Sequence, residues 1–344
     1  MSDIDIRIQG RAGRITLRRP EALNALTWDM IRAIKTALDD WAGDPEVALL
    51  VIDAEGRAFA AGGDIKEMYR TGTAGDYGYG RRFWADEDRM NARMFRFPKP
   101  VVTCLQGFTM GGGVGVGCHG SHRIVRDDSR IAMPECSIGL VPDVGGSLIL
   151  ARAPGRCGEY LGTTATRMGP GDAIHAGFAD YYVPEGWDAL IAELCETGDH
   201  EAVDRAASAP PASPLAGMQA DIDRSFGGET LRDILRALRH EGSEFARDAL
   251  AKLGKVSPLS AACTVELIHR VRTRDDIVHA LEQEYRFTAR SMEKGDFLEG
   301  IRAAVIDRDG APDWRHDGPD APTPAEISAM LLPLRDAPPL EIEP

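Results

Sequence analysis

Several residue patterns are missing from this 344-residue chain, and each absence excludes a class of chemistry. The cysteines form no CxxC pair, and scattered cysteines in a chain of this length are typical of free thiols in a reducing compartment. The histidines include no HxH or HxxxH pair, so we expect no metal site. The six cysteines are Cys104, Cys118, Cys136, Cys157, Cys195 and Cys263.

The motifs of two large enzyme classes are also missing. The chain has no GxSxG sequence of the kind that carries a nucleophilic serine, and it has no Walker-A sequence. The glycine run at residues 111–115 does not place a GxGxxG at the opening of a βαβ unit. Hydride transfer through a bound dinucleotide is therefore not expected, and we expect no cofactor.

Excess positive charge and long apolar runs are lacking as well. With 40 Lys and Arg against 54 Asp and Glu, the formal net charge is −14, which argues against a nucleic-acid or anionic-membrane partner. No apolar run approaches the roughly 18 residues that a membrane-spanning helix requires. The first residues, MSDIDIRIQG, have neither the basic nor the apolar region of a signal peptide. We expect a cytoplasmic protein.

The N-terminal part alternates between strand and helix patterns. Isoleucines alternate with polar residues at positions 4–8, and the alternation resumes at 15–17 after a glycine turn, which predicts a β-hairpin. Thr27 is the predicted N-cap of a helix that ends near Gly43, and residues 47–52 predict a buried strand. The Gly- and Tyr-rich residues 71–80 predict a mobile loop.

A helix pattern follows that loop and leads to a glycine-rich segment. It has Phe83, Met90 and Met94 on one side, with Glu87 and Asn91 one turn apart on another. Residues 101–105 then predict a second buried strand, which enters the segment 107–146. The alternation of strands and helices predicts an α/β fold with parallel or mixed strands. The short strands favour an irregular spiral over a regular doubly wound sheet.

Strand patterns largely end near residue 186, and helical patterns replace them. Residues 208–215 predict a linker, and helix patterns follow at 231–238, 245–253, 259–271 and 277–292. We therefore divide the chain into an α/β core at 1–200, a helical region packed on that core at 201–330, and a tail at 331–344 that is poorly ordered at its end.

Two glycine turns are candidates for binding a carbonyl oxygen. A strand pattern runs into Gly62 and Gly63 within GRAFAAGGDIKEM (56–68), and a triplet stands at 111–113. Small residues at strand ends let backbone N–H groups face a ligand. Acyl-thioester chemistry needs two such donors where negative charge develops on the oxygen, and Gly63 and Gly112 could supply them. The plain structural alternative is a tight strand-to-helix turn.

Two acids in apolar surroundings are candidates for catalysis. Glu135 and Asp143 stand eight residues apart across a Pro-rich turn. A carboxylate beside an apolar pocket can act as base or nucleophile, with a pKa set by desolvation. The alternative for either is a helix cap or a core acid paired with a backbone amide, and the alternative for Glu87 is a solvated acid.

Several of these segments resemble a known superfamily. AFAAGGDIKEM, GFTMGGGVGVG and MPECSIGLVPDVGG are similar to the signature of the enoyl-CoA hydratase/isomerase (crotonase) superfamily, and ALNAL at 22–26 extends the match. Within it, the chain is most similar to the 3-hydroxyisobutyryl-CoA hydrolases of valine breakdown. The supporting pieces include IGLVPDVGG and the late stretch EYRFTARSMEKGDFLEGIRAAVIDRDGAPDW at 284–314. The resemblance covers nearly the whole chain.

The resemblance implies a fold, a substrate and an assembly. The fold is the crotonase spiral of repeated ββα units with a C-terminal helical region. CoA enters as part of an acyl-CoA thioester substrate, with its adenine near residues 58–65. Superfamily members often form trimers and hexamers, so a homo-oligomer is implied. The residues implied to contact the substrate are Ala60, Asp64, Ile65, Lys66, Glu87, Gly112, Glu135 and Asp143.

The resemblance also implies catalytic roles. Gly63 and Gly112 match the oxyanion amides, and Glu135 and Asp143 match catalytic acids. Hydratases of the superfamily carry a further glutamate soon after the glycine triplet, where this chain has Gly115. That difference favours a thioesterase acting on 3-hydroxyisobutyryl-CoA or a close 3-hydroxyacyl-CoA.

Alternatives remain open at this stage. Glu135 either attacks the carbonyl carbon or activates water, and Asp143 either moves protons or binds the substrate hydroxyl. The rival functions are an enoyl-CoA isomerase or atypical hydratase and, from another class, a non-catalytic acyl-CoA-binding protein.

Overall fold

The structure is a computed structural model that describes residues 3–335 and 337–342. The predicted tail at 331–344 lies partly outside these described residues. The chain forms two compact units, each assembled from segments that alternate along the sequence. Unit 1 comprises the described residues of Met1–Gly63, Arg89–Ala132 and Arg167–Ala216. Unit 2 comprises those of Asp64–Asp88, Met133–Thr166 and Gly217–Pro344. The division at residue 200 that we drew from the sequence stays a prediction.

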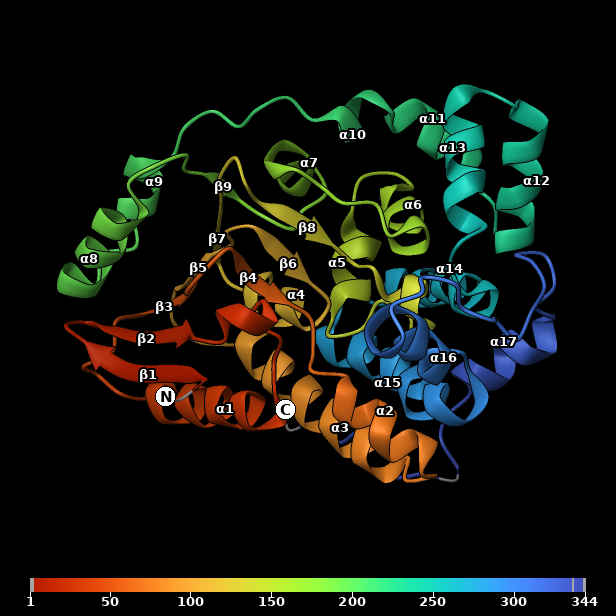
Figure 1. Cartoon of the computed structure of the whole chain (residues 1–344). Coiled ribbons are helices and arrows are strands. Elements are labelled where there is room, and N and C mark those ends of the chain that lie inside the picture. The colour runs from red at the N-terminus through yellow and green to blue at the C-terminus, as the bar shows by residue number, and fades with distance from the viewer. Residues whose placement is uncertain (1–2, 336, 343–344) are drawn as a thin grey trace. The chain divides into compact units, whose positions relative to one another are not determined.

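Unit 1 contains the strands labelled in Figure 1, which form two sheets. The larger sheet has the order β1-β2-β3-β5-β7-β9, and the smaller has the order β4-β6-β8. Only β1 and β2 pair antiparallel, as the predicted hairpin, and the other strand pairs within the described residues are parallel. The strands are β1 (Ile4–Gln9), β2 (Ala12–Leu17), β3 (Leu49–Ala54), β4 (Ala58–Ala61), β5 (Val101–Cys104), β6 (Phe108–Met110), β7 (His122–Val125), β8 (Arg130–Ala132) and β9 (Tyr181–Tyr182).

The order of these strands along the chain makes unit 1 a spiral. Each of β3, β5 and β7 joins the larger sheet, and the strand that follows it joins the smaller one. Successive turns are therefore one strand further along both sheets, and parallel pairing brings the carboxyl ends of neighbouring strands to one edge. The structure confirms the predicted α/β spiral.

The helices of unit 1 follow from local sequence signals. The predicted N-cap is confirmed, because the Thr27 side chain accepts a hydrogen bond from the Met30 N–H at 3.2 Å, and the helix is capped at its end by Gly43. Apolar residues of α8 and α9 pack on the larger sheet beside Val51, Val102 and Ile124. The helices are η1 (Pro20–Ala22), α1 (Trp28–Ala42), α4 (Gly112–Gly117), α7 (Pro170–His175), α8 (Trp187–Thr197) and α9 (Ala202–Ala206).

Unit 2 is helical in its described residues. The four late helix patterns are confirmed as α12, α13, α14 and α15. Two helices, α3 (Gly78–Phe95) and α10 (Pro214–Gly217), have residues in both units. The others are α2 (Lys66–Thr73), η2 (Glu135–Ile138), α5 (Gly146–Arg152), α6 (Cys157–Thr164), α11 (Gln219–Ser225), α12 (Leu231–Glu241), α13 (Glu244–Leu253), α14 (Pro258–Arg272), α15 (Ile277–Lys294), α16 (Phe297–Ile301), η3 (Arg302–Ile306) and α17 (Pro324–Leu331).

The predicted loop at residues 71–80 is wrong in its extent. Residues 71–73 continue α2 and residues 78–80 begin α3, so only 74–77 connect them. Two of the glycines serve helix packing: a Cβ on Gly72 would lie 2.7 Å from Leu298, and a Cβ on Gly80 would lie 2.3 Å from Met292. Both contacts are with the ends of side chains from neighbouring helices, so these glycines lie in helix contacts and not in a loop.

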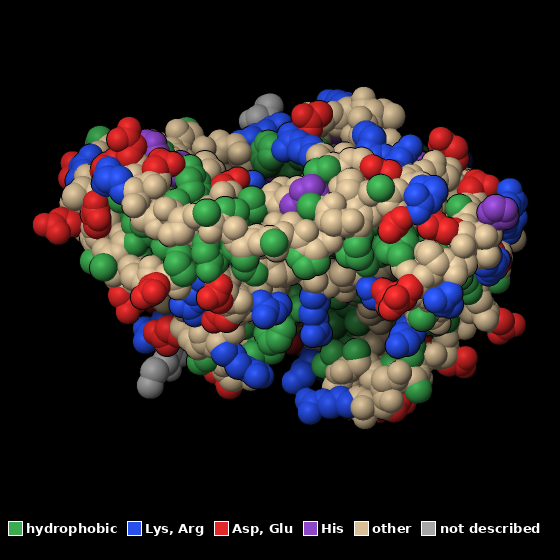
Figure 2. Space-filling view, turned by 90° about the horizontal axis from the view of Figure 1, so that it is seen from above, with side chains coloured by type: hydrophobic (Ala, Val, Ile, Leu, Met, Phe, Trp, Pro, Cys, Tyr) green, Lys and Arg blue, Asp and Glu red, His purple; other side chains and the backbone are tan. Residues whose placement is uncertain are grey.

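Surface charge and membrane propensity agree with the composition. Acidic and basic side chains are interspersed over the face shown in Figure 2, so the net negative charge is not gathered into one field there. Among the described residues, no helix combines the length and the apolar character that crossing a membrane demands.

Candidate active site

The two glycine turns of unit 1 lie at one edge of the smaller sheet. β4 and β6 are parallel neighbours, and Ala61 stands opposite Met110 at their carboxyl ends. Gly62 and Gly63 follow the first strand, and the triplet 111–113 follows the second. The spiral therefore brings together two turns that are about fifty residues apart in sequence.

Backbone conformation explains the glycines in these turns. Gly62 has a φ of +103° and Gly111 a φ of +51°, which side chains disfavour. The Gly62 carbonyl accepts a hydrogen bond from the Leu26 N–H at 2.9 Å, which fixes the peptide before Gly63. Gly112 is the first residue of α4, where a helix N–H has no acceptor within the helix. The roles of Gly63 and Gly112 as oxyanion donors stay predictions.

The contact between α4 and β4 also requires a glycine. A Cβ on Gly113 would lie 2.2 Å from the carbonyl oxygen of Ala60, which is too close for any side chain. The buried strand residue Ala60 therefore contacts α4 and limits how far the helix N-terminus can shift.

The remaining predicted CoA contacts belong to unit 2 and stand at the start of α2. That helix begins at Lys66, with Ile65 in the N-cap position. Lys66 is exposed, whereas Asp64 and Ile65 are half-buried. Their contact with CoA stays a prediction.

Three predicted acids of unit 2 form an electrostatically coupled cluster. Glu87 on α3, Glu135 at the first residue of η2 and Asp143 in the turn before α5 are all buried. The alternative for Glu87, a solvated acid, is wrong, because the exposed fraction of Glu87 is 3%. Glu87 and Glu135 are far apart in the sequence and interact only in the folded chain, so their coupling was not visible in the sequence.

Burial shifts the titration of all three acids. It raises the pKa of Glu135 to about 8, and repulsion from Glu284 and Glu87 acts in the same direction. Burial raises the pKa of Glu87 to about 8 as well. The pKa of Asp143 lies well above its usual value because of burial and of the charges on Glu135, Glu87, Glu284 and Asp88. Closely spaced buried carboxylates cannot all ionise, so the cluster can hold an acid and a base at once.

Two oxygens of this cluster have no partner. Within the described residues, Glu135 Oε2 and Glu87 Oε1 are buried and accept no hydrogen bond. A buried polar atom without a partner is costly and marks a place where a ligand is expected to bind. By contrast, no group of three or more His, Cys, Asp or Glu side chains in the described part of the chain is arranged to hold a metal ion.

Sequence reasoning missed a fourth buried acid, Glu284 on α15. Its carboxylate accepts hydrogen bonds from the Gly145 N–H at 2.8 Å, the Ser147 N–H at 3.0 Å and the Ser147 hydroxyl. Burial raises the pKa of Glu284 to about 7, although these three hydrogen bonds act in the opposite direction. Helical spacing places Glu284 on the same face of α15 as positions 277, 281 and 288, which could have indicated its burial but not its contacts.

The enoyl-CoA hydratase/isomerase family model matches residues 12–331. The chain belongs to this family. Rat (Rattus norvegicus) mitochondrial 3-hydroxyisobutyryl-CoA hydrolase is 37% identical over 320 residues, which cover 89% of this chain and 83% of the rat protein. A protein from Arabidopsis thaliana named probable 3-hydroxyisobutyryl-CoA hydrolase 3 is 35% identical over 317 residues, with 87% and 83% covered.

Solved structures confirm the crotonase fold of this family member over almost its whole length. An enoyl-CoA hydratase from Rhodobacter sphaeroides is 54% identical with a TM-score of 0.92, covering 97% of this chain and 98% of that one. A carnitinyl-CoA dehydratase from Mycobacterium thermoresistibile is 37% identical with a TM-score of 0.94, covering 100% and 99%. The chain is therefore an enzyme of the crotonase family, and a cytoplasmic location stays a prediction.

Gly115 stands at the position where we expect the hydratases of the family to carry a glutamate. It lies in α4, three residues after Gly112, and it is buried. The chain therefore has no carboxylate at this point of α4.

Proposed function

We propose that this enzyme hydrolyses 3-hydroxyisobutyryl-CoA, or a close 3-hydroxyacyl-CoA, to the free acid and CoA, a reaction of valine degradation. The shared name of the curated relatives supports the substrate. The observation that carries the proposal is the buried pair Glu135 and Asp143, whose charges are coupled and whose pKa values are raised.

In the proposed reaction, the carbonyl carbon of the thioester gains an oxygen and loses the CoA sulfur. The amides of Gly63 and Gly112 donate hydrogen bonds to the carbonyl oxygen as it gains negative charge. Ionised Glu135 either attacks the carbonyl carbon or removes a proton from the attacking water. The C–S bond breaks when the tetrahedral intermediate collapses, and the CoA thiolate takes a proton.

The raised pKa of Asp143 suits the second proton transfer. A carboxyl group that stays protonated near neutral pH can supply the proton that the thiolate takes. Asp143 and Glu87 are also proposed to bind the hydroxyl of the acyl group, since carboxyl groups accept and donate hydrogen bonds to alcohols. CoA is consumed and released as part of the substrate, and the reaction as written needs no cofactor.

Contacts to the CoA portion are proposed at Ala60, Asp64, Ile65 and Lys66. Backbone groups near a strand end can contact adenine, and the exposed Lys66 ammonium can meet a phosphate. A homo-oligomer, a trimer or a hexamer, is proposed from the family alone, and sedimentation equilibrium of the purified enzyme tests it.

A second candidate function is hydration or isomerisation of an enoyl-CoA. The observation in its favour is the 54% identity with a structure described as an enoyl-CoA hydratase. Against it stands Gly115, because addition of water across a double bond uses two carboxylates in the hydratases that the sequence resembles. The other alternative, a non-catalytic acyl-CoA-binding protein, disagrees with membership in a family of enzymes and with the unpartnered acid oxygens.

A substrate panel tests the role of the hydroxyl. Thiol release is followed with a thiol reagent for 3-hydroxyisobutyryl-CoA, 3-hydroxypropionyl-CoA and isobutyryl-CoA. We expect kcat/KM to be at least about 100-fold lower for isobutyryl-CoA, because buried carboxyl groups would lose their partner. Equal values for the hydroxylated and plain acyl chains would contradict the proposed substrate class.

The two routes for Glu135 are separated by a single turnover in oxygen-18 water. A covalent anhydride between Glu135 and the acyl group is trapped by hydroxylamine, and its hydrolysis by attack of water on the Glu135 carbonyl carbon leaves the heavy isotope in the Glu135 side chain. Water attack with Glu135 as base leaves the label only in the released acid. Mass spectrometry of the peptide that contains Glu135 distinguishes the two results.

A further inference from the structure

The turn that carries Asp143 has an unfavourable backbone. Asp143 is followed by Val144 with a φ of +55° and by Gly145 with a φ of +76°. The left-handed conformation is rare for a β-branched residue, and it persists only where the surroundings hold it. The contacts that fix this turn therefore bear on the direction of the Asp143 side chain.

Glu284 supplies such contacts from α15, more than 130 residues away in sequence. Its Oε2 accepts the Gly145 N–H, and its Oε1 accepts the Ser147 N–H and the Ser147 hydroxyl. The three donors come from the second and fourth residues after Asp143. Glu284 and Ser147 both have exposed fractions of 0%, so no solvent competes for these bonds.

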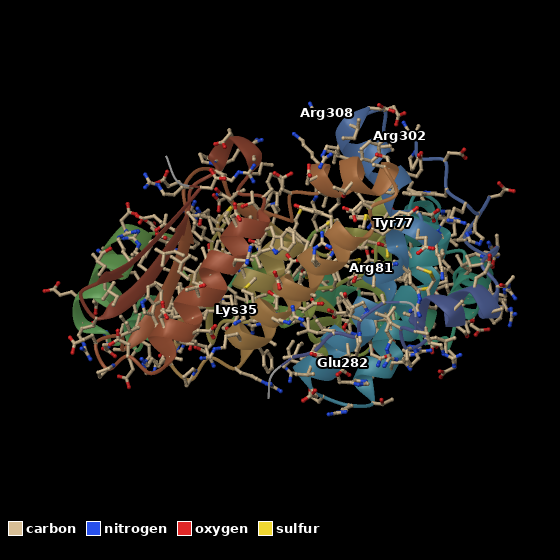
Figure 3. The ribbon with its side chains drawn as sticks, turned by 90° about the horizontal axis from the view of Figure 1, so that it is seen from below. Lys35, Tyr77, Arg81, Glu282, Arg302 and Arg308 are labelled. Atoms are coloured by element: carbon tan, nitrogen blue, oxygen red, sulfur yellow. The ribbon has the colours of Figure 1, made fainter. Side chains whose placement is uncertain are left out.

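The same helix also holds the N-terminal part of α3, which carries Glu87. The Tyr285 hydroxyl donates to the Arg81 carbonyl at 3.2 Å, and Arg81 Nε donates to the Ala289 carbonyl at 2.9 Å. Arg81, labelled in Figure 3, also pairs with Glu293 at 3.2 Å. Adjacent residues of α15, Glu284 and Tyr285, thus contact the two segments of unit 2 that carry Asp143 and Glu87.

Both oxygens of Glu284 are engaged by these donors, which leaves it unsuited to act as a base itself. We propose that Glu284 is a positioning residue: by holding the turn at Gly145 and Ser147, it sets the direction of the Asp143 side chain, and it places its own carboxylate charge beside Glu135. This inference rests on the proposed thioesterase function for its catalytic readout, but its structural part does not.

Two substitutions separate the reach of Glu284 from its charge. Glu284→Gln keeps the length but replaces one acceptor oxygen with a donor, and Glu284→Asp keeps the charge but shortens the side chain. We expect Glu284→Gln to lower kcat for thiol release about 10- to 100-fold with KM within about threefold, as misplacement of a reacting group does. Glu282→Gln, on the same helix and labelled in Figure 3, is the matched control with unchanged kcat.

If Glu284 had only a structural role, its replacement would leave the pH dependence of kcat/KM unchanged. The charged or titratable groups that act on Asp143 are Glu135, Glu87, Glu284 and Asp88. Removing the Glu284 charge lets the remaining acids ionise at lower pH, so the rise of kcat/KM with pH moves to lower pH in Glu284→Gln. In Glu284→Asp the profile keeps its wild-type position while kcat falls.

Amide hydrogen exchange of the full-length enzyme tests the structural part without any substrate. In Glu284→Gln, we expect the amides of Gly145 and Ser147 to exchange at least about tenfold faster than in the wild type. If Glu284→Gln does not fold, Ser147→Ala takes its place and removes the hydroxyl donor to Glu284. We expect Ser147→Ala to lower kcat about three- to tenfold and to increase the hydrogen-exchange rates of the same two amides.

The outcomes are distinguishable. Wild-type kcat, pH profile and exchange rates in a folded Glu284→Gln variant, or in Ser147→Ala where that variant replaces it, would overturn the inference and leave the thioesterase proposal standing. A wild-type enzyme that releases no thiol from any 3-hydroxyacyl-CoA would sink the proposed function, and the exchange rates would still decide whether Glu284 fixes the turn.

Discussion

At the scale of single residues, the central feature is Glu135, a carboxylate whose ionised form is destabilised by its surroundings. Glu135 is buried, has an unpartnered oxygen and lies beside other acids. Each of these conditions disfavours its ionised form, and ionised Glu135 is the form that the proposed reaction uses. The enzyme therefore keeps a reactive base at a cost in stability.

Replacement of this carboxylate tests its catalytic role. We expect Glu135→Gln to lower kcat for thiol release by about 10³-fold or more, since loss of a positioned base or nucleophile costs about 10²–10⁴. The measurement is the initial rate at saturating 3-hydroxyisobutyryl-CoA. Glu244→Gln, at an exposed first-turn position of α13, is the matched control and should keep the wild-type rate. A variant Glu135→Gln with full turnover would favour a non-catalytic role.

The pH dependence of catalysis follows from the raised pKa of Glu135. Because the base must be ionised, kcat/KM is expected to rise about tenfold per pH unit below an apparent pKa near 8 and then to level off. The apparent value belongs to the coupled cluster. A profile that is flat between pH 6 and 9 would show that no acid with a raised pKa limits the reaction.

The raised pKa of Glu135 also predicts that the stability of the folded enzyme falls with rising pH, whereas kcat/KM rises. A carboxyl group whose pKa is higher in the folded state holds a proton there that the unfolded chain has already released. Stability therefore falls as the pH rises from about 5 to about 8. Glu135→Gln removes this loss, so its melting temperature relative to the wild type should increase between pH 5.5 and pH 8.5 by a few degrees. A difference that is constant across this range would contradict the shift.

Sequence reasoning found Glu135, Asp143 and Glu87 as candidates but could not find their coupling. The pKa of a buried acid depends on which charges lie beside it, and those neighbours come from α3, η2 and α15, which are far apart in sequence. Glu284 was overlooked because its role depends on a contact with residues 145–147 that no local pattern encodes.

At the scale of elements, the glycine turns show which constraints are local and which are not. The positive φ of Gly62 and Gly111 is a local property that a glycine-rich motif suggests. The approach of α4 to the Ala60 carbonyl is a tertiary contact, and it requires glycine at position 113 as strictly as the positive φ does at positions 62 and 111. The reverse holds at Gly72 and Gly80, because a glycine-rich pattern predicts a loop where the two glycines in fact lie in helix contacts.

Gly113→Ala tests the fit of α4 against β4. The added Cβ would collide with the Ala60 carbonyl oxygen, so the N-terminus of α4 must shift. We expect kcat to fall about 10²-fold through misplacement of the Gly112 amide and stability to fall by about 1–3 kcal/mol through overpacking.

A matched control for this substitution is Gly43→Ala. Gly43 caps α1 with an αR backbone, and its added Cβ would have nothing within 4 Å. Activity and melting temperature should stay at the wild-type values. Full activity of Gly113→Ala would show that the position of α4 is not coupled to the reaction.

At the scale of the whole molecule, the spiral could be predicted as a class but not as a topology. The ββα start, the short strands and the late helices were all readable from periodicity and turn residues. The division of β4, β6 and β8 into a second sheet was not, because strand partners are chosen by long-range packing. The interleaving of the two units along the chain has the same origin.

Membership in this family indicates that the chain acts on CoA thioesters, but it does not select one reaction. Relatives are named as hydrolases, while solved structures are described as a hydratase and a dehydratase. A shared fold can support several reactions, and the residues of the site select among them. We propose that Gly115 is the position in this chain that separates hydrolysis from hydration.

The measurement that tests the proposed thioesterase function most directly compares two reactions of the purified enzyme under the same conditions. Free thiol released from 3-hydroxyisobutyryl-CoA is followed with a thiol reagent, and hydration of crotonyl-CoA is followed by the loss of its enoyl absorbance. We expect kcat/KM for thiol release to be at least about 100-fold above that for hydration, because one of the two hydrating carboxylates is missing. Rapid hydration of crotonyl-CoA without thiol release from the hydroxyacyl substrate would contradict it.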